Sequence, residues 1–209
     1  MTYRRRGRNP ARAQAPETAP EDPEAYARGL VLDALSRSAR TRGQLADLLT
    51  RKGVEPELAE AVLERYAELG LVDDAAYAEA FTRSRHEHKG LGSRAIAFEL
   101  RRRSVPDELV QEAVSVLDTE TEQATAGRLA AERLARMAAL PREVQARRLA
   151  GFLARKGYGG EVAGRAVREA MAAAKEAAME AESAVDGPQW AADADEDGFD
   201  PDALAFTED

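Results

Sequence analysis

The chain offers few side chains of the kinds that perform catalysis. It has no cysteine, and its two histidines, His86 and His88, lie two positions apart, so on a helix they point to different faces and cannot chelate a metal together. We expect both histidines at the solvated surface. No serine lies in a nucleophile elbow. The sequence therefore predicts a protein that is not an enzyme, with no catalytic residue, no metal ligand and no cofactor.

Two short polar motifs have both a structural and a chemical interpretation. Asp73 and Asp74 could begin a cation site, but no third ligand lies at a coordinating spacing, so we expect Asp74 to cap the following helix. The turn from Gly90 to Arg94 (GLGSR) could cradle a phosphate at a helix N-terminus, yet it lacks the ending of a P-loop and no strand precedes it. An ordinary turn between helices, with Ser93 as the cap, is the favoured interpretation.

Basic side chains carry the strongest chemical signal. Seven bases face two acids between residues 83 and 103, and ten bases face three acids between residues 128 and 168. This excess favours a polyanionic or acidic partner. A run of three arginines also suits the C-terminal end of a helix dipole, so that structural role stays open beside a contact surface. The candidate partner-binding residues are Arg94, Arg101, Arg102, Arg103, Arg147, Arg148, Arg155 and Lys156.

The net charge of −8 is unevenly distributed along the chain. Residues 1–24 begin with a basic, proline-rich arm, and residues 176–209 hold twelve carboxylates and no base. Neither segment has enough apolar residues for a core, so we expect both to be disordered. The arm suits nonspecific phosphate contacts or solubility alone, and the acidic tail suits nucleic-acid mimicry or shielding of the basic units.

The elements that must position these residues come from an internal repeat. The segment from Leu45 to Leu63 matches two later segments, with Leu49 in the place of Leu100 and of Leu153. A period of about fifty residues with apolar positions in register is typical of stacked units that share a core. Each copy has the pattern of a helix, a break and a second helix. The sequence predicts an all-α fold: an elongated array of three tandem three-helix repeats over residues 25–74, 75–118 and 119–175.

Local signals predict where these helices begin and end. A first helix should run from Pro23 to about residue 38, and Thr41 should cap the second through a capping box with Gln44. Gly53 suits the left-handed turn that ends this second helix. Ser104 stands at the equivalent break of the second repeat, where the turn must form without glycine. In the third repeat the last helix should run from residue 161 and fray near residue 174.

The order of these motifs resembles the RecX family of recombination regulators. The resemblance rests on Gly70-Leu71-Val72-Asp73-Asp74, on Tyr77, Ala78 and Phe81, on the Gly90-x-Gly92 turn, and on the recurrent Leu-x-x-Lys-Gly-Val/Tyr of residues 49–54 and 153–158. It covers residues 25–172, and Ser104 departs from the usual glycine. It implies a curved helical protein that binds the RecA recombinase and its DNA filament and inhibits filament extension, ATP hydrolysis and strand exchange, which modulates DNA repair and the SOS response.

A helix-turn-helix transcription regulator is the alternative function, since residues 41–63 fit that motif by themselves. A recognition helix should expose arginine, lysine, asparagine or glutamine, but this one would expose glutamates and repel phosphates. We therefore favour a cytoplasmic, monomeric RecA-filament partner, with single- or double-stranded DNA as a further partner of the basic second and third repeats. No segment has the run of about 20 apolar residues that a membrane span needs.

Overall fold

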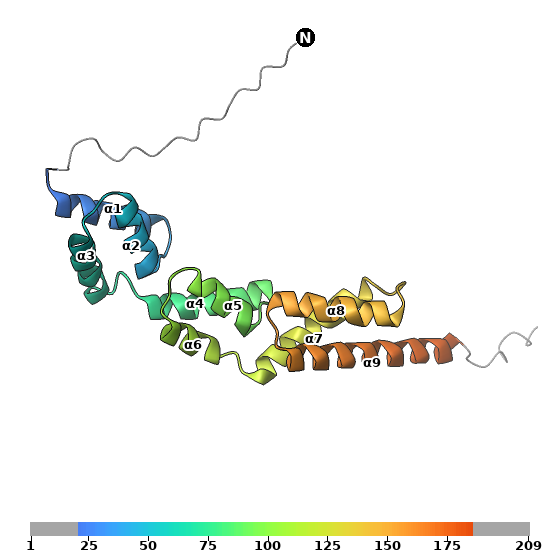
Figure 1. The fold of residues 1–209 in the computed structure, drawn as a ribbon. Coiled ribbons are helices and arrows are strands. Elements are labelled where there is room, and N and C mark those ends of the chain that lie inside the picture. The colour runs from blue at the N-terminus through green and yellow to red at the C-terminus, as the bar shows by residue number, and fades with distance from the viewer. Residues whose placement is uncertain (1–20, 186–209) are drawn as a thin grey trace, which may run out of the picture.

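The computed structural model describes residues 21–185, and within them it consists of α-helices and connecting turns (Figure 1). The helices follow one another along an elongated molecule, with α1 at one end and the C-terminus of α9 at the other. Their bounds are α1 Pro23–Arg37, α2 Arg42–Arg51, α3 Pro56–Glu68, α4 Asp74–Lys89, α5 Ser93–Arg101, α6 Asp107–Ser115, α7 Thr119–Ala135, α8 Arg142–Lys156 and α9 Gly160–Val185.

The buried side chains form three separate cores, each built by three consecutive helices. Leu45 and Leu49 lie in the first core, Ile96 and Leu100 in the second, and Leu149 and Leu153 in the third, all with 0% exposure. Burying a leucine or isoleucine of this kind contributes about 1.5–3 kcal/mol. The predicted all-α array of tandem three-helix units is confirmed. We propose that the units meet near residues 74 and 118, where one group of three helices gives way to the next.

The breaks between the paired helices follow the predicted chemistry. Thr41 and Gln44 form both hydrogen bonds of the capping box at the start of α2. Gly53 and Gly157 end α2 and α8 with φ of +78° and +91°. Ser104, at the equivalent position after α5, has φ of +58°, a left-handed conformation that costs a side-chain-bearing residue about 1–2 kcal/mol. The second break is thus made against a steric penalty, as its sequence predicts.

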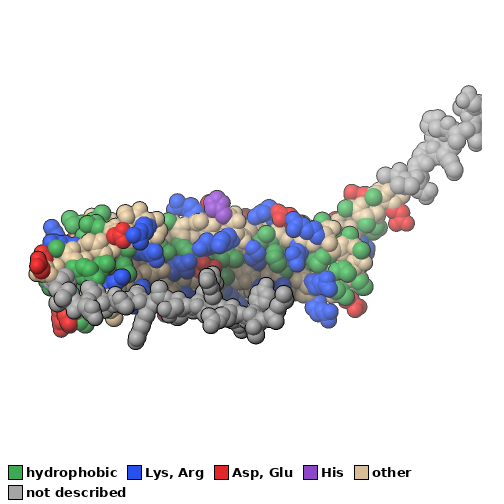
Figure 2. Space-filling model, turned by 90° about the horizontal axis from the view of Figure 1, so that it is seen from above, with side chains coloured by type: hydrophobic (Ala, Val, Ile, Leu, Met, Phe, Trp, Pro, Cys, Tyr) green, Lys and Arg blue, Asp and Glu red, His purple; other side chains and the backbone are tan. Residues whose placement is uncertain are grey.

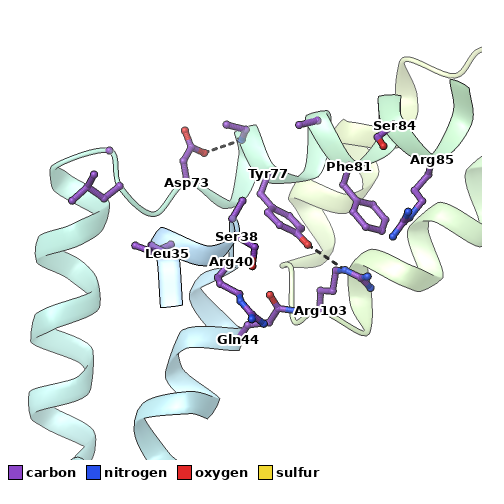
Figure 3. Close-up of a pocket in the computed structure, with 15 residues that line it drawn as sticks. Leu35, Ser38, Arg40, Gln44, Asp73, Tyr77, Phe81, Ser84, Arg85 and Arg103 are labelled. Carbon is purple, nitrogen blue, oxygen red and sulfur yellow. Dashed lines mark hydrogen bonds between the residues drawn. The ribbon is translucent and has the colours of Figure 1, made fainter. Parts of the chain in front are cut away.

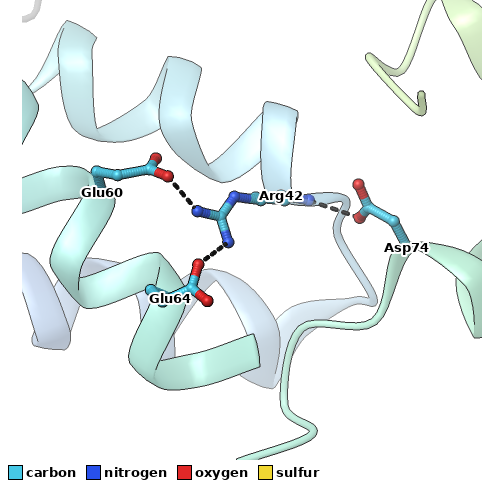
Figure 4. Close-up of polar contacts among 4 residues, drawn as sticks. All are labelled: Arg42, Glu60, Glu64 and Asp74. Atoms are coloured by element: carbon cyan, nitrogen blue, oxygen red, sulfur yellow. Dashed lines mark hydrogen bonds and ion pairs between the residues drawn. The ribbon is translucent and has the colours of Figure 1, made fainter. Parts of the chain in front are cut away.

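The aspartate pair shows that the predicted cap was wrong by one residue. Asp73 caps α4, and its side chain accepts a hydrogen bond from the backbone N–H of Ala76. Asp74 is the first residue of α4, and its Oδ1 accepts from the backbone N–H of Arg42 at 2.7 Å, at the start of α2 (Figure 4). Burial raises the pKa of Asp74, while the Arg42 N–H opposes that shift. Asp74 therefore joins the first unit to the second.

The second and third units meet through the same kind of bond. Glu122 lies in the first turn of α7, and its Oε1 accepts from the backbone N–H of Ser93 at 2.7 Å, at the start of α5. In each joint, a carboxylate from the first helix of one unit caps the second helix of the preceding unit. Asp74 and Glu122 thus satisfy otherwise unpaired N–H groups and favour the positive end of the helix dipole.

In each joint the start of the capped helix, α2 or α5, also contacts the turn that ends the second helix of the following unit, α5 or α8. Thr41 Oγ1 donates to the Arg103 carbonyl at 2.5 Å, and the Gly92 N–H donates to the Lys156 carbonyl at 2.9 Å. A Cβ added at Gly43 would clash with the Cβ of Ser104, so glycine is required where these two segments touch. The two joints are therefore similar, since each has a carboxylate bound to a helix-start N–H and a hydrogen bond to a carbonyl of the break turn.

The last helix is longer than the sequence analysis predicts. The sequence predicts that this helix frays near residue 174, but α9 continues to Val185. Between residues 160 and 183, Ala170 is the last buried residue of α9, and residues 172–183 are exposed beyond the third core. Alanine, glutamate and methionine have high intrinsic helix propensity, which explains a helix without packing partners. Residues 176–185, which the sequence analysis assigns to the disordered tail, are part of α9 in the structure. The rest of the tail lies outside the described residues, as do residues 1–20 of the arm.

Candidate functional site: an arginine groove on the third unit

The third unit carries a groove lined mainly by arginine side chains. It has a volume of about 600 Å³ and lies between the C-terminal part of α7 and the length of α8. Met137 and Gly151 form its apolar lining. We call this surface the arginine groove; its basic residues are Arg133, Arg136, Arg147, Arg148 and Arg155.

Helical spacing explains why these side chains share one surface. Arg147, Gly151 and Arg155 follow one another at intervals of four residues, so they line one face of α8. Leu149 and Leu153 occupy the opposite face and anchor α8 in the third core. Because the apolar face is fixed by burial, the arginine face must point to solvent.

The arginine groove gathers cations that are unpaired within residues 21–185, whereas several other arginines of the chain have carboxylate partners. All five guanidinium groups are exposed, and none forms an ion pair or a hydrogen bond with any residue between 21 and 185. By contrast, Arg28, Arg37, Arg128 and Arg165 are each paired with a carboxylate on the same helix. Five uncompensated positive charges repel one another and attract an anion. The groove is thus suited to phosphates or to several carboxylates.

Basic side chains also mark other parts of the surface. Figure 2 shows lysine and arginine side chains recurring along the face seen from above, with few acidic groups between them. Arg94 is also exposed, and it lies beside Gly159, outside the residues that line the groove. A long anion could therefore contact more than one unit.

The structure separates the predicted site residues into different roles. Arg147, Arg148 and Arg155 lie together in the arginine groove. Lys156 does not: its Nζ donates to the carbonyl of Lys89, which ties the third unit to the second. Arg101 is paired with Asp107 at 2.7 Å, in the second unit.

The other two arginines of that run differ in exposure. Arg102 is exposed, with its guanidinium 5.9 Å from the Phe98 ring centroid. Arg103 is partly buried: its Nε donates to the Tyr77 hydroxyl at 3.2 Å, and its guanidinium lies 4.5 Å from the centroid of the Phe81 ring. Arg103 is therefore structural in this conformation, whereas Arg102 is exposed and has no carboxylate partner between residues 21 and 185.

Arg103 belongs to a second concave surface, between the first and second units (Figure 3). This cleft has a volume of about 720 Å³. Tyr77 and Phe81 stack on its α4 wall with ring centroids 5.9 Å apart, and Arg85 covers the same Phe81 ring. Arg85 is also paired with Glu99 at 3.1 Å. Arg85 and Arg103 thus have a carboxylate or a hydroxyl partner, which the guanidinium groups of the arginine groove lack among residues 21–185.

Further sequence expectations concern the end of α4 and the turn that follows it. His86 is buried, contrary to the expected solvated position; its Nδ1 lies 3.0 Å from the Leu91 carbonyl and its Nε2 lies 3.0 Å from Thr125 Oγ1. His88 is exposed, as expected. The turn is a helix connection, but Gly92 rather than Ser93 is the N-cap of α5. The N–H that a phosphate would seek is bound by Glu122.

Comparisons with known proteins now decide the family. The model of the first three-helix domain of RecX matches residues 27–65, and that of the second matches residues 73–114. The chain is 49% identical over 155 residues to "Regulatory protein RecX" of Thermobifida fusca, which covers 74% of this chain and 84% of that protein. The chain belongs to the RecX family.

Other RecX proteins agree in sequence and fold. "Regulatory protein RecX" of Streptomyces lividans is 47% identical over 152 residues, with 73% of this chain and 81% of that protein covered. The crystal structure of RecX from Lactobacillus salivarius superposes with a TM-score of 0.67 at 18% identity, covering 71% of this chain and 96% of that one. A second RecX crystal structure gives 0.61 at 25% identity, covering 68% and 70%. The family resemblance expected from the motifs is confirmed.

Sequence reasoning missed two members of the arginine groove. Arg133 and Arg136 lie at the end of α7, and Arg133 lies over the Phe152 ring of α8 at 5.1 Å. Their spacing of three residues placed them on one helix face. It gave no sign that this face opens toward α8.

The helices between residues 21 and 185 include none with the length and apolar character of a membrane span.

Proposed function

We propose that this RecX-family chain binds the RecA recombinase and its nucleoprotein filament, and that it inhibits filament extension, ATP hydrolysis and strand exchange. Homologous recombination, DNA repair and the SOS response would be modulated through that inhibition. A cytoplasmic location and a non-catalytic mode of action follow from this partner. Family membership supports the proposal, because RecX relatives are named regulatory proteins.

The arginine groove is the single observation that supports a direct contact with the filament. A filament of protein on DNA presents a regular series of anionic groups, and an elongated array can follow such a polymer over several units. The arginine groove supplies five cationic groups that form no ion pair with any residue between 21 and 185, and exposed Arg94 and Arg102 add cations on the second unit. We assign the groove as the main anion contact and the second unit as its continuation.

The alternative function, a helix-turn-helix transcription regulator, is disfavoured by the charge of α3. Glu60 and Glu64 on α3 hold the guanidinium of Arg42 at 2.5 Å and 3.1 Å (Figure 4). These two exposed carboxylates share one guanidinium, so the cluster keeps a negative charge that phosphates in a major groove would repel. We therefore retain one function.

The test is a titration of RecA-catalysed ATP hydrolysis on single-stranded DNA with the full-length chain. We expect the rate to fall as the chain is added, and strand exchange to fall with it. Arg147→Glu together with Arg148→Glu should weaken the inhibition by about tenfold in the concentration required, because two contacts become repulsive. An unaffected hydrolysis rate with the wild-type chain would rule out the proposed function.

A matched control variant distinguishes the effect of charge in the groove from the effect of net charge. Arg51→Glu together with Lys175→Glu changes the net charge equally, at exposed positions outside the groove. This control should inhibit like the wild type. Arg103→Glu is unsuitable as a probe, because it would break the bond to Tyr77 and disturb the cleft between the units. Equal loss in the groove and control variants would show that the location of the charge is unimportant.

A further inference from the structure

The arginine groove concentrates positive charge on one exposed surface of the third unit. Its five guanidinium groups repel one another, and residues 21–185 provide no carboxylate that pairs with any of them. A cluster of this kind raises the local concentration of any anion tethered nearby. An acidic segment of the same chain would be such a tethered anion.

The sequence supplies one acid-rich segment without competing bases. Residues 186–209 contain nine aspartate or glutamate residues and no lysine or arginine. We define them as the acidic segment. Its charge is complementary to the groove in sign, and its length lets several carboxylates meet several guanidinium groups at once. Charge-assisted pairs between arginine and carboxylate are stronger than neutral hydrogen bonds.

The fold brings the start of this segment to the correct end of the molecule. α8 begins beside α9, where an Arg142 amino group donates to the Met171 carbonyl at 2.9 Å. Arg147 and Arg148 follow within the next two turns of α8. Figure 1 shows α9 continuing past this point at the end of the molecule opposite α1. The acidic segment is therefore attached to the same unit as the groove.

The geometry of the chain allows the segment to return to the groove. From Met171 to Val185 the helix rises by roughly 21 Å. The 24 residues of the acidic segment can extend to about 80 Å. The covalent link then holds the carboxylates near the groove at an effective concentration on the order of millimolar.

We propose that the acidic segment, residues 186–209, docks into the arginine groove of its own chain and competes there with an external polyanion. The docked state keeps the groove closed to weakly bound anions. A polyanionic filament, with its higher charge density, displaces the segment. The competition is autoinhibitory: it lowers the affinity for short or isolated anions more than for a continuous filament. The docking is independent of the proposed function, and only its regulatory consequence for the recombinase rests on that function.

The absence of cysteine gives a direct test of docking in the full-length chain. A spin label is attached to Ala203→Cys, and paramagnetic broadening of backbone amide signals is measured. We expect the largest broadening at Gly151 and Arg147 in the groove, and none at Gly53 in the first unit. The broadening should disappear in about 0.5 M NaCl, where charges separated by more than about 4 Å are screened.

Three variants of the labelled chain decide whether the groove is the docking site. Replacing every acid from residue 186 onward by asparagine or glutamine should abolish the broadening, and so should Arg147→Glu with Arg148→Glu. The control Arg51→Glu with Lys175→Glu should retain it. Circular dichroism of each variant checks that the helices persist. Strongest broadening on the first unit or on the basic arm, or broadening that survives reversal of the groove, would overturn the proposal.

A mixing experiment and an affinity measurement complete the test. Isotope-labelled chain without a spin label is mixed with unlabelled, spin-labelled chain; broadening in this sample would assign the segment to a second copy and refute docking within one chain. Binding of a fluorescent oligothymidylate of about 20 nucleotides should become about tenfold tighter when the tail acids are neutralised. Unchanged affinity would refute competition. Groove broadening without inhibition of RecA would reject the proposed function and leave the docking intact.

Discussion

The close approach of Gly43 and Ser104 allows a quantitative test of the joint between the first and second units. Gly43 lies in the first turn of α2, and Ser104 makes the left-handed turn after α5. A Cβ at Gly43 would clash with Ser104 Cβ and would lie 3.0 Å from the Ser104 carbonyl oxygen. Gly43→Ala therefore forces one unit away from the other.

The expected change in the free energy of unfolding is the balance of a stabilising and a destabilising contribution in each variant. Alanine in place of helical glycine stabilises by up to about 1 kcal/mol, and overpacking a tight contact costs about 1–3 kcal/mol. We expect Gly43→Ala to destabilise by about 1–2 kcal/mol. Ser104→Gly relieves about 1–2 kcal/mol of left-handed strain but adds about 0.5–1 kcal/mol of unfolded-state entropy. It should be neutral or stabilising by about 1 kcal/mol.

The double variant reveals whether the two positions act through contact. With Ser104→Gly in place, the clashing Cβ is gone and only the carbonyl contact remains, so Gly43→Ala should become nearly neutral. The coupling free energy should be about 1–2 kcal/mol, measured by urea unfolding followed by far-UV circular dichroism. Hydrogen exchange of the Arg42 amide, which binds Asp74 across the joint, reports the same contact locally. It should accelerate in Gly43→Ala and recover in the double variant.

Gly29→Ala is the matched control for helix propensity. Gly29 lies within α1, and a Cβ there meets no atom within 4 Å. This change should stabilise by up to about 1 kcal/mol. If the two single effects at Gly43 and Ser104 add within about 0.5 kcal/mol, the inferred contact is wrong.

Three further predictions concern bonds between units. Asp74→Ala should destabilise the fold by about 1 kcal/mol, as for a lost helix cap. Asp74→Asn keeps an oxygen that can accept from the Arg42 N–H, so it should lose less stability. Equal losses of the two variants in calorimetry would show that this hydrogen bond is unimportant. Burial, with a smaller effect of Glu122, raises the pKa of Tyr158 to about 12, so the folded chain retains the phenolic proton that the unfolded chain loses. Stability should then fall as pH rises from about 10 to about 12, and a phenolate absorbance step near pH 12 should be missing in Tyr158→Phe. The same substitution removes the hydroxyl bond to the Gly90 carbonyl at 3.1 Å and should cost about 1 kcal/mol in urea unfolding at neutral pH; an unchanged midpoint would contradict that bond's role.

The sequence by itself determined the features that depend on a few neighbouring residues. Apolar spacing specified the helices, Thr41 and Gln44 specified a capping box, and Gly53 specified a left-handed end. The repeat then predicted three similar units, because equivalent leucines must be buried in equivalent ways. These signals are local or periodic, so they can be read without knowing how the units meet.

Only the tertiary structure decided which groups meet across units and helices. It assigned Asp74 to Arg42 of the preceding unit, placed His86 between two polar partners, and made Arg103 structural. It also joined Arg133 and Arg136 to the arginines of α8, because the gap between α7 and α8 depends on how the whole third core packs. Charge density along a sequence shows that an anion will be attracted, but only the packing of helices defines the surface that receives it.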